Sequence, residues 1–303
     1  MEKGLCELCN PKQWKTVSTS ELTSTGYPVY GANGVIGYYS NYNHEKETLL
    51  ITCRGATCGT LNICNPFSYI NGNAMALDDL SDEIDIKYLY YFLLSRGLSD
   101  TITGSAQPQI VRQSLKNVRV IYPNLDAQKR IIYVLGKADE LLSIRKQQIA
   151  KLDELVKVRF VEMFGDDIYP KVKVSRVCDF ITKGTTPPNN LISEKYSSDK
   201  VPYLKVYNLS FTGKLLFDTA PQYVPENIHN GVLARSKVYP NDVLMNIVGP
   251  PLGKFALVTD EFSEWNINQA IAIFRSKEKV NPKYLLFALM QSTVYKGLHR
   301  VGI

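Results

Sequence analysis

The clearest pattern of apolar and polar positions lies in the middle of the chain. Apolar residues recur every seven positions from Leu135 to Met163, and a second row begins at Ile131. This heptad pattern predicts a long coiled-coil-type helix over residues 126–163, which would form a rod of roughly 57 Å. Such a rod is longer than the diameter of one domain, so we expect the apolar residues along one side of it to pack against a partner helix. These residues are Ile131, Leu135, Ala138, Leu142, Ile149, Leu152, Val156 and Met163, and together they form the apolar stripe.

Two arginines interrupt the second row of this stripe. Arg145 and Arg159 occupy row positions where a symmetric dimer would bury like charges opposite each other, which argues against such a seam along the whole length. A core helix inside a single domain is the alternative, but most helices of globular proteins end within about 20 residues.

The stretches on either side of the helix resemble each other. "RGATCG" (54–59) corresponds to "VGPPLG" (248–253), "NGNAMAL" (71–77) to "NINQAIAI" (266–273), and "IDIKYLYYFLL" to "VNPKYLLFALM". Each copy predicts a strand, a glycine-bounded turn, a polar cluster leading into a second strand, and a short helix. Three matches in the same order indicate a duplicated module. We therefore predict an α+β fold with two similar domains, residues 1–125 and 166–303, separated by the helical segment 126–165.

The segment "YPVYGANGVIGYY" (27–39) places glycines at regular intervals among aromatic and branched residues. A nucleotide-binding loop needs its glycines between a buried strand and a helix. No helical pattern follows here, and Asn33-Gly34 is a strong hairpin signal. The segment therefore predicts a tight β-turn.

Composition and charge narrow the class of protein. The chain has 303 residues, 45% of them hydrophobic, and a net charge of +6, which would help a nucleic-acid partner without proving one. No apolar run approaches the roughly 18 residues that cross a bilayer, and no signal peptide is evident, so we expect a cytoplasmic protein.

Cysteine placement gives little support to a metal site. Five of the six cysteines precede residue 65, which excludes a disulfide framework spanning both halves. Cys6 and Cys9 form a lone C-x-x-C, and the later cysteines have the wrong spacing to complete a zinc knuckle. Buried free thiols and no bound metal are the expectation.

Catalytic motifs are not found in the sequence. It has no P-loop, and "CNPF" (64–67) and "VGPP" (248–251) both miss the tetrapeptide of adenine methyltransferases. The acidic cluster near Asp85 is expected to complement a helix dipole rather than to form a nuclease site. His44, His229 and His299 are scattered, the first two in segments expected to be solvated loops. The chain is therefore predicted to be non-enzymatic.

Side chains of the types that read base edges gather in the turns of both modules. Arg, Lys, Asn and Gln, assisted by Ser and Thr, hydrogen-bond to bases, although Asn also favours turns whatever the function. The predicted DNA-binding residues are Arg54, Thr57, Asn71, Asn73, Ser105, Gln107, Gln109, Arg112, Lys205, Asn208, Asn246, Asn266, Asn268 and Gln269.

The chain resembles the specificity subunits of Type I restriction-modification systems over essentially its whole length. The resemblance is carried by "YPVYGANGVIGYY" (27–39), "RGATCG" (54–59) before "NGNAMAL" (71–77), "GSAQPQI" (104–110) and the helical segment beginning "AQKRIIYVLGKADELL" (127). The resemblance implies a non-catalytic subunit with two target recognition domains, each grasping half of a bipartite double-stranded DNA target. It also implies long helices that pack antiparallel, set the gap between half-sites and dock the modification (methyltransferase) subunits and, through them, the restriction subunits. S-adenosylmethionine, ATP and Mg are then expected on those partners and not on this chain.

One departure from the family pattern concerns the second long helix. The second copy ends at Ile303, opposite about Gln107 of the first, so the second long helix of the family is missing from this sequence. Either the sequence is truncated or another chain supplies the helix, and we expect self-association or dependence on a partner through the exposed stripe. Two other functions remain compatible with the sequence, the recognition half of a fused restriction-methylation enzyme and a coiled-coil scaffold without a DNA role.

Overall fold

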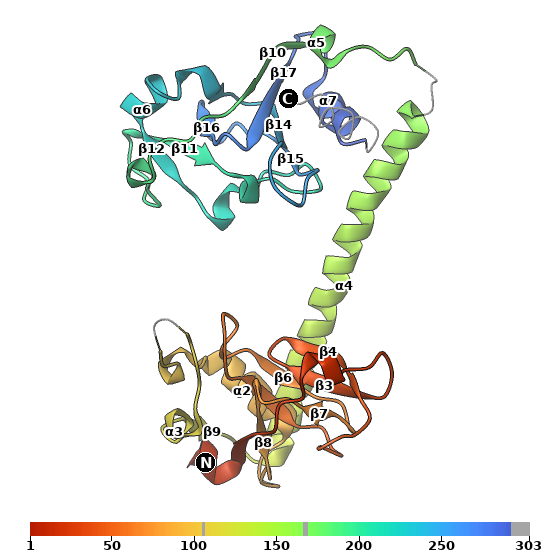
Figure 1. Ribbon diagram of the computed structural model, residues 1–303, viewed down its shortest axis with the longest axis vertical. Helices are drawn as coiled ribbons and strands as arrows, with labels where there is room; N and C mark the ends of the chain where they lie inside the picture. Colours follow the sequence, from red (N-terminus) through yellow and green to blue (C-terminus); the bar gives the residue numbers. More distant parts are fainter. Residues whose placement is uncertain (105–106, 166–168, 292–303) are drawn as a thin grey trace. The chain divides into compact units, whose positions relative to one another are not determined.

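The computed structural model describes residues 1–104, 107–165 and 169–291 (Figure 1). Internal contacts divide the chain into unit 1, Met1–Lys146, and unit 2, Gln147–Ile303. The division falls inside the long helix α4, Leu125–Phe164, so each unit includes one half of that helix.

Unit 1 is built on a four-stranded antiparallel sheet with the order β2-β8-β5-β6. A second sheet, β4-β3-β7, pairs β3 antiparallel to β4 and parallel to β7, and β1 pairs with β9. The strands are β1 (Glu2–Gly4), β2 (Asn10–Gln13), β3 (Tyr27–Gly31), β4 (Gly34–Tyr39), β5 (Leu49–Thr52), β6 (Leu61–Ile63), β7 (Tyr69–Ile70), β8 (Ala74–Asp78) and β9 (Arg119–Ile121). The helices before α4 are α1 (Leu5–Leu8), η1 (Thr19–Glu21), α2 (Ile86–Arg96), η2 (Ser99–Thr101) and α3 (Arg112–Leu115).

Unit 2 repeats this plan. Its main sheet has the order β10-β17-β14-β15, and its second sheet, β12-β11-β16-β13, pairs β11 antiparallel to β12 and parallel to β16. The strands are β10 (Cys178–Lys183), β11 (Lys200–Leu204), β12 (Tyr223–Pro225), β13 (Lys237–Val238), β14 (Val243–Asn246), β15 (Phe255–Leu257), β16 (Trp265–Ile267) and β17 (Ile271–Ser276). The helices are α5 (Val174–Val177), η3 (Asn189–Leu191), η4 (Val206–Asn208), η5 (Phe217–Thr219), α6 (Glu226–Asn230), η6 (Ala234–Ser236) and α7 (Pro282–Leu289).

The two units therefore share one topology. Strands β2, β8, β5 and β6 correspond to β10, β17, β14 and β15, and the trio β4-β3-β7 corresponds to β12-β11-β16. Each of the three sequence matches falls on equivalent elements, the last of them on α2 and α7. The predicted α+β fold, with two similar sheet-rich units on either side of a long helix, is confirmed.

The main sheet of each unit is buried on both faces. In unit 1, Met75 and Leu77 of β8 share a core with Leu89 of α2, whereas Ala76 packs in a separate cluster with Ile70 of β7. Successive strand residues point to opposite faces, so β8 is covered by α2 on one face and by the smaller sheet on the other. This explains the continuous apolar run of that strand.

Unit 2 shows the same arrangement. Phe274 of β17 packs in a cluster with Leu286 of α7, and Ile273 packs in another with Ile267 of β16. Each unit thus buries its own core, and each presents the turns at the ends of its strands outside that core.

Polar side chains begin the predicted helices. Asp85 Oδ1 accepts a hydrogen bond from Lys87 N at 2.8 Å at the start of α2, and Asn281 Oδ1 accepts one from Lys283 N at 2.9 Å at the start of α7. Helix α4 starts after Asn124 and ends before Gly165, close to the predicted bounds. No helix in the described ranges combines the length and apolar character that crossing a membrane requires.

The glycine-containing segment 27–39 forms the predicted hairpin of β3 and β4. Gly31 pairs with Gly34, so the two-residue loop is Ala32-Asn33, one position earlier than the Asn33-Gly34 signal suggested. Gly34 has a φ of 93°, which favours glycine. No helix follows the hairpin, and the next regular element is strand β5.

Candidate nucleic-acid interface

Three loop segments of unit 1 meet at one end of its main sheet. Cys53, which follows β5, donates its N–H to Asn73 O at 3.0 Å and accepts a hydrogen bond from Ile110 N at 3.0 Å. Arg54 and Gln109 form an isolated antiparallel bridge beside these contacts. Backbone contacts therefore hold together the loop 53–60, the turn 71–73 and the described residues 103–104 and 107–110.

Five of the predicted DNA-binding residues on these loops have exposed side chains that a ligand could reach. They are Arg54, Thr57, Asn73, Gln107 and Gln109. Arg112 is also exposed and opens α3 just beyond the same segment. Ser105 lies outside the described residues. The exposed set supplies hydrogen-bond donors and acceptors together with one cationic side chain on the bridged loops.

Asn71 does not belong to this exposed set. Its residue is 3% exposed, its Oδ1 accepts hydrogen bonds from Gly72 N at 2.8 Å and Val17 N at 3.2 Å, and its Nδ2 donates to Val17 O. The expectation that Asn71 faces DNA is therefore corrected, because this side chain fastens the segment around Val17 to the turn after β7.

In unit 2 the equivalent turn follows β16. Asn268 donates its N–H to Leu204 O at 3.0 Å, as Asn71 does to Tyr30 O in unit 1. Lys205 follows Leu204 at the end of β11, and Lys205 and Asn268 are half-buried whereas Gln269 is exposed. The structure thus brings these three predicted residues to one edge of the sheet.

The segment after β10 joins this edge. Gln269 N donates to Thr186 Oγ1 at 3.4 Å, and Arg235 Nε of η6 donates to Thr185 Oγ1 at 3.1 Å. Arg235 and Thr186 are exposed. Sequence reasoning missed these residues because "LARSKV" carries no turn signal of Asn or Gly and because nothing local links residue 235 to residue 185.

Three further predicted residues of unit 2, Asn208, Asn246 and Asn266, are fully buried and are corrections. Asn246 Oδ1 accepts from Lys254 N at 2.8 Å and its Nδ2 donates to Pro251 O, which shapes the loop 247–254. Asn208 Oδ1 accepts from Lys205 N at 2.9 Å. Buried amides whose oxygen and nitrogen both hydrogen-bond within the protein stabilise the local structure and are not available to a base.

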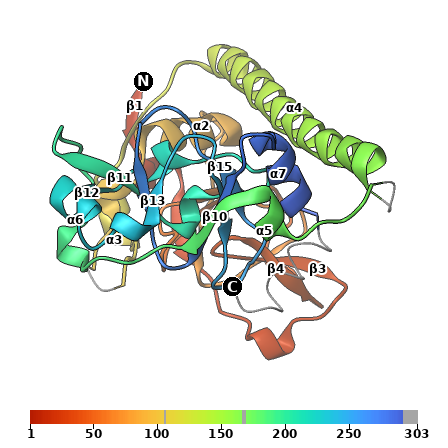
Figure 2. The same cartoon turned by 90° about the horizontal axis from the view of Figure 1, so that it is seen from above.

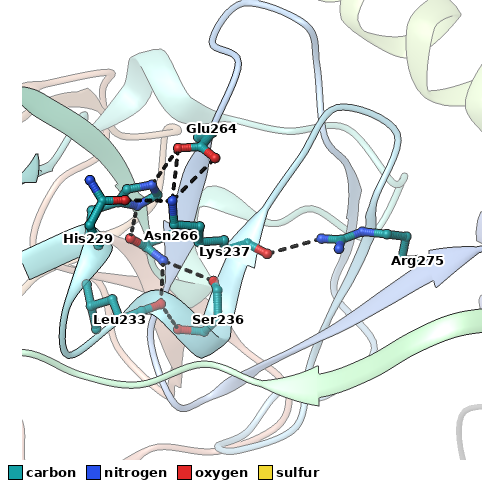
Figure 3. Close-up of polar contacts among 8 residues, drawn as sticks. His229, Leu233, Ser236, Lys237, Glu264, Asn266 and Arg275 are labelled. Atoms are coloured by element: carbon teal, nitrogen blue, oxygen red, sulfur yellow. Dashed lines mark hydrogen bonds and ion pairs between the residues drawn. The ribbon is translucent and has the colours of Figure 1, made fainter.

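The histidines also differ from expectation, since His44 and His229 are buried rather than solvated. His229 Nδ1 faces Asn266 Oδ1, and its Nε2 lies 2.8 Å from Glu264 Oε2 (Figure 3). His44 Nδ1 similarly faces Asn43 Oδ1 at 2.7 Å, and its Nε2 lies 2.8 Å from Asp78. Hydrogen bonding from His229 lowers the pKa of the Glu264 carboxyl. His299 lies outside the described residues.

The cysteines are free thiols. Burial raises the pKa of Cys9 to about 12 and that of Cys178 to about 11, so these thiols stay protonated and unreactive at neutral pH. Among the described residues no group of three His, Cys, Asp or Glu side chains is arranged to hold a metal ion.

Helix α4 is fixed to unit 1 near its start. Gln128 is fully buried, its Oε1 accepts a hydrogen bond from Asp85 N at 2.8 Å, and its Nε2 donates to Glu83 O and Pro123 O, both at 2.9 Å. Farther along, Tyr91 of α2 donates its hydroxyl proton to Asp139 at 2.8 Å. Burial and this hydrogen bond raise the pKa of Tyr91 to about 12.

Within unit 2, the second half of α4 packs against α7 and one loop. The ring of Phe160 lies 5.4 Å from that of Tyr284 and 5.7 Å from that of Phe287, and α7 lies beside this half of α4 (Figure 2). Lys157 Nζ donates to Phe211 O at 2.8 Å. Phe287 and Tyr91 occupy matching positions of the duplicated helices, so α4 uses the same position of α2 and of α7.

The apolar stripe of α4 is largely uncovered. An open groove of ≈ 380 Å³ with an almost wholly apolar lining lies between its second half and α7, bordered by Leu155, Val156, Arg159, Phe160, Met163, Phe164 and Phe287. The predicted partner-facing residues Ile131, Leu135, Ala138, Leu142, Ile149, Leu152, Val156 and Met163 are all exposed, Leu152 by 60%.

Comparison with known proteins gives a consistent result. Residues 1–154 match the family described as "Type I restriction modification DNA specificity domain". The chain is 30% identical over 115 residues to the Type I restriction enzyme EcoprrI specificity subunit of Escherichia coli, an alignment covering 38% of this chain and 28% of that protein. It is 22% identical over 283 residues to the MjaVIII specificity subunit of Methanocaldococcus jannaschii, covering 86% of this chain and 64% of that one.

The fold is also found in a solved structure. The crystal structure of a Type I restriction-modification system S subunit from M. genitalium superposes with a TM-score of 0.52 at 15% identity, covering all of this chain and 80% of that one. The alignments with the two curated relatives named above span less than two thirds of those proteins' own length.

Proposed function

The chain belongs to the family of Type I restriction-modification DNA specificity subunits, since the family match covers half of it, and from this premise we propose that it reads a bipartite duplex DNA target without catalysing a reaction. The observation that carries the proposal is the duplicated topology, in which each unit has an exposed polar side chain, Asn73 or Gln269, on the turn that follows its parallel-paired strand, β7 or β16, with further exposed polar side chains on neighbouring segments. Two similar readers on one chain suit a target of two half-sites.

The reading surface of unit 1 would be the bridged loops after β5. Arginine and glutamine side chains make paired hydrogen bonds with guanine and adenine edges in the major groove, and Arg54 and Gln109 lie side by side there. In unit 2 the corresponding surface would be formed by Lys205 and Gln269 at the end of β11 and β16. Cationic side chains on both surfaces would also bind phosphates and make the affinity salt-dependent.

Helix α4 would act as the spacer between the half-sites. Its 40 residues correspond to a rod of about 60 Å, which matches roughly 17 or 18 base pairs of B-DNA at 3.4 Å each and sets an upper limit on the gap.

We further propose that the exposed stripe of α4 binds helices of other chains. Its uncovered apolar residues and the groove beside α7 support a partner that supplies a second helix, either a second copy or a modification subunit. The modification subunits would carry S-adenosylmethionine and, through them, restriction subunits would join with ATP and Mg. The resemblance to the family and the uncovered stripe support these partners.

The decisive experiment is methylome sequencing of the source cell with and without this gene. The proposal expects one class of bipartite sites to lose methylation when the gene is deleted and to regain it on complementation, which gives both half-sites and their spacing. An unchanged methylome in a cell whose modification subunits are expressed would contradict the proposal.

A further inference from the structure

A buried hydrogen-bond network in unit 2 holds the short helix η6 against β16 (Figure 3). Asn266 Nδ2 donates to both Leu233 O at 3.2 Å and Ser236 O at 3.0 Å, the two residues that flank or close η6. Since both amide hydrogens are used in this way, Oδ1 of Asn266 remains as the acceptor that meets His229 Nδ1. Asn266 therefore clamps the whole turn to the sheet.

His229 holds the Asn266 side chain in place and is itself held by Glu264. Its side chain is fully buried, and its Nε2 lies 2.8 Å from Glu264 Oε2, a carboxylate that Lys237 Nζ also approaches at 3.2 Å. Lys237 Nζ donates in addition to Asn230 Oδ1 at 2.7 Å, within α6. The network connects α6, η6 and β16, so the position of η6 has little freedom.

The one long cationic side chain that η6 presents to solvent is Arg235. Its Nε donates to Thr185 Oγ1, and within the described part of the chain its two terminal nitrogens meet no protein acceptor. Thr185 is adjacent to Thr186, which accepts the N–H of Gln269. Thr185 thus holds Nε of Arg235 on the surface that also carries Gln269, while the two terminal nitrogens of the guanidinium have no acceptor among the described residues.

We propose that Arg235 is a DNA contact of unit 2, and that His229 and Asn266 are positioning residues that hold it in place. The inference rests on the proposed function and deepens it by naming a contact outside the turn motifs. A planar fork with two free terminal nitrogens suits either a guanine edge or a backbone phosphate. Restraint of Nε by Thr185 and of the backbone by Asn266 lowers the conformational freedom lost on binding.

The test measures binding of the complex with modification subunits to the methylome-defined duplex and to a scrambled duplex, by fluorescence anisotropy at several salt concentrations. Arg235→Ala should weaken binding to the target by about 5- to 150-fold. Loss confined to the target indicates a guanine contact, whereas equal loss on both duplexes with a salt slope smaller by about 1 indicates a phosphate contact. Arg176→Ala, an exposed arginine of α5, is the matched control and should change neither value.

Target affinity of Arg235→Ala equal to wild type would overturn the inference while leaving the proposed function intact. A wild-type complex that binds both duplexes equally would instead count against the proposed function. The two failures are therefore distinguishable.

A double-mutant cycle tests the positioning role. His229→Gln should weaken target binding, but in the Arg235→Ala background it should cause little further loss, because its effect passes through the absent guanidinium. Glu264→Gln, at a partly exposed position, provides a milder variant should His229→Gln fold poorly. Each affinity is calculated for the fraction of protein that is active in DNA binding, which a stoichiometric titration measures. Additive losses in both cycles would show that the network affects binding independently of Arg235 and would refute the positioning role.

Discussion

The hydrogen bonds of Gln128 allow a quantitative test of how α4 is joined to unit 1. The side chain is completely buried, and its amide accepts one hydrogen bond from Asp85 N and donates two, to Glu83 O and Pro123 O. Gln128→Ala removes all three hydrogen bonds, each of them partly buried, and leaves the N–H of Asp85 and the carbonyls of Glu83 and Pro123 without these partners. Each hydrogen bond contributes roughly 1 kcal/mol net, so the substitution should lower the unfolding free energy of unit 1 by about 3 kcal/mol.

The assay can follow the two units separately. The chain contains two tryptophans, Trp14 in unit 1 and Trp265 in unit 2. Labelling with 5-fluorotryptophan gives one ¹⁹F signal for each unit, and a urea titration then yields one unfolding midpoint for each. Gln128→Ala should shift the Trp14 midpoint to lower urea and leave the Trp265 midpoint in place.

Gln147→Ala, an exposed glutamine of the same helix, is the control and should change either midpoint by no more than the equivalent of about 0.5 kcal/mol. A loss below about 1 kcal/mol at the Trp14 signal for Gln128→Ala would refute the assigned role of the three hydrogen bonds. An equal shift of both signals would refute the independence of the two cores.

Three other outcomes follow from the structure. Gly184→Ala should lower the unfolding free energy of unit 2 by about 3 kcal/mol or more, read from the Trp265 signal, because the added Cβ would collide with the backbone oxygen of Asn268 in the turn after β16. His229 lowers the pKa of Glu264 in the folded state. The Glu264 carboxylate therefore contributes stability above its unfolded pKa of about 4.3, and this stability is lost as the pH falls through the lower folded pKa. Urea titrations between pH 7 and pH 3 should show the difference in unfolding free energy between wild type and Glu264→Gln closing as the pH falls. Leu152→Glu should weaken association through α4 at least tenfold, measured by sedimentation or by pull-down with modification subunits, and should change monomer stability little. Lys151→Glu, on the same helix turn, is the charge control and should leave association unchanged. Equal effects of the two substitutions would show that charge alone governs association.

The apolar pattern was sufficient to predict much of the fold. The heptad rows specify a 3.5-residue period that only a helix satisfies, and the structure has α4 at Leu125–Phe164. The duplicated segments carry strand and helix signals in one order, and equivalent strands occupy equivalent places in both sheets. The parallel pairing of β3 with β7 was not predictable, because it joins segments about 40 residues apart through few and short strands.

The candidate site was harder to predict because an asparagine in a turn has two opposite uses. Asn71 and Asn73 lie two residues apart, yet the first is buried beneath the turn and the second is exposed. The choice depends on which backbone groups come from distant segments, such as those of Val17. The same reason explains His229, whose partners Asn266 and Glu264 lie more than 30 residues away in sequence.

The two units differ in where the duplicated framework carries its cationic side chains. Matching hydrogen bonds, from Cys53 N to Asn73 O and from Ile247 N to Ala270 O, make Arg54 equivalent to Val248. Unit 2 therefore has no cation at that position.

At the ends of β3 and β11 the cationic side chain belongs to unit 2 instead of unit 1. The N–H groups of Asn71 and Asn268 bind Tyr30 O and Leu204 O, which makes Gly31 equivalent to Lys205. Unit 1 therefore has a cationic donor at Arg54 and none at Gly31, whereas unit 2 has one at Lys205 and none at Val248. Since the shared sheets fix the backbone positions, two readers of this kind would present donors to different places along a DNA groove, and an asymmetric target with unlike half-sites is the arrangement that the exchanged positions favour.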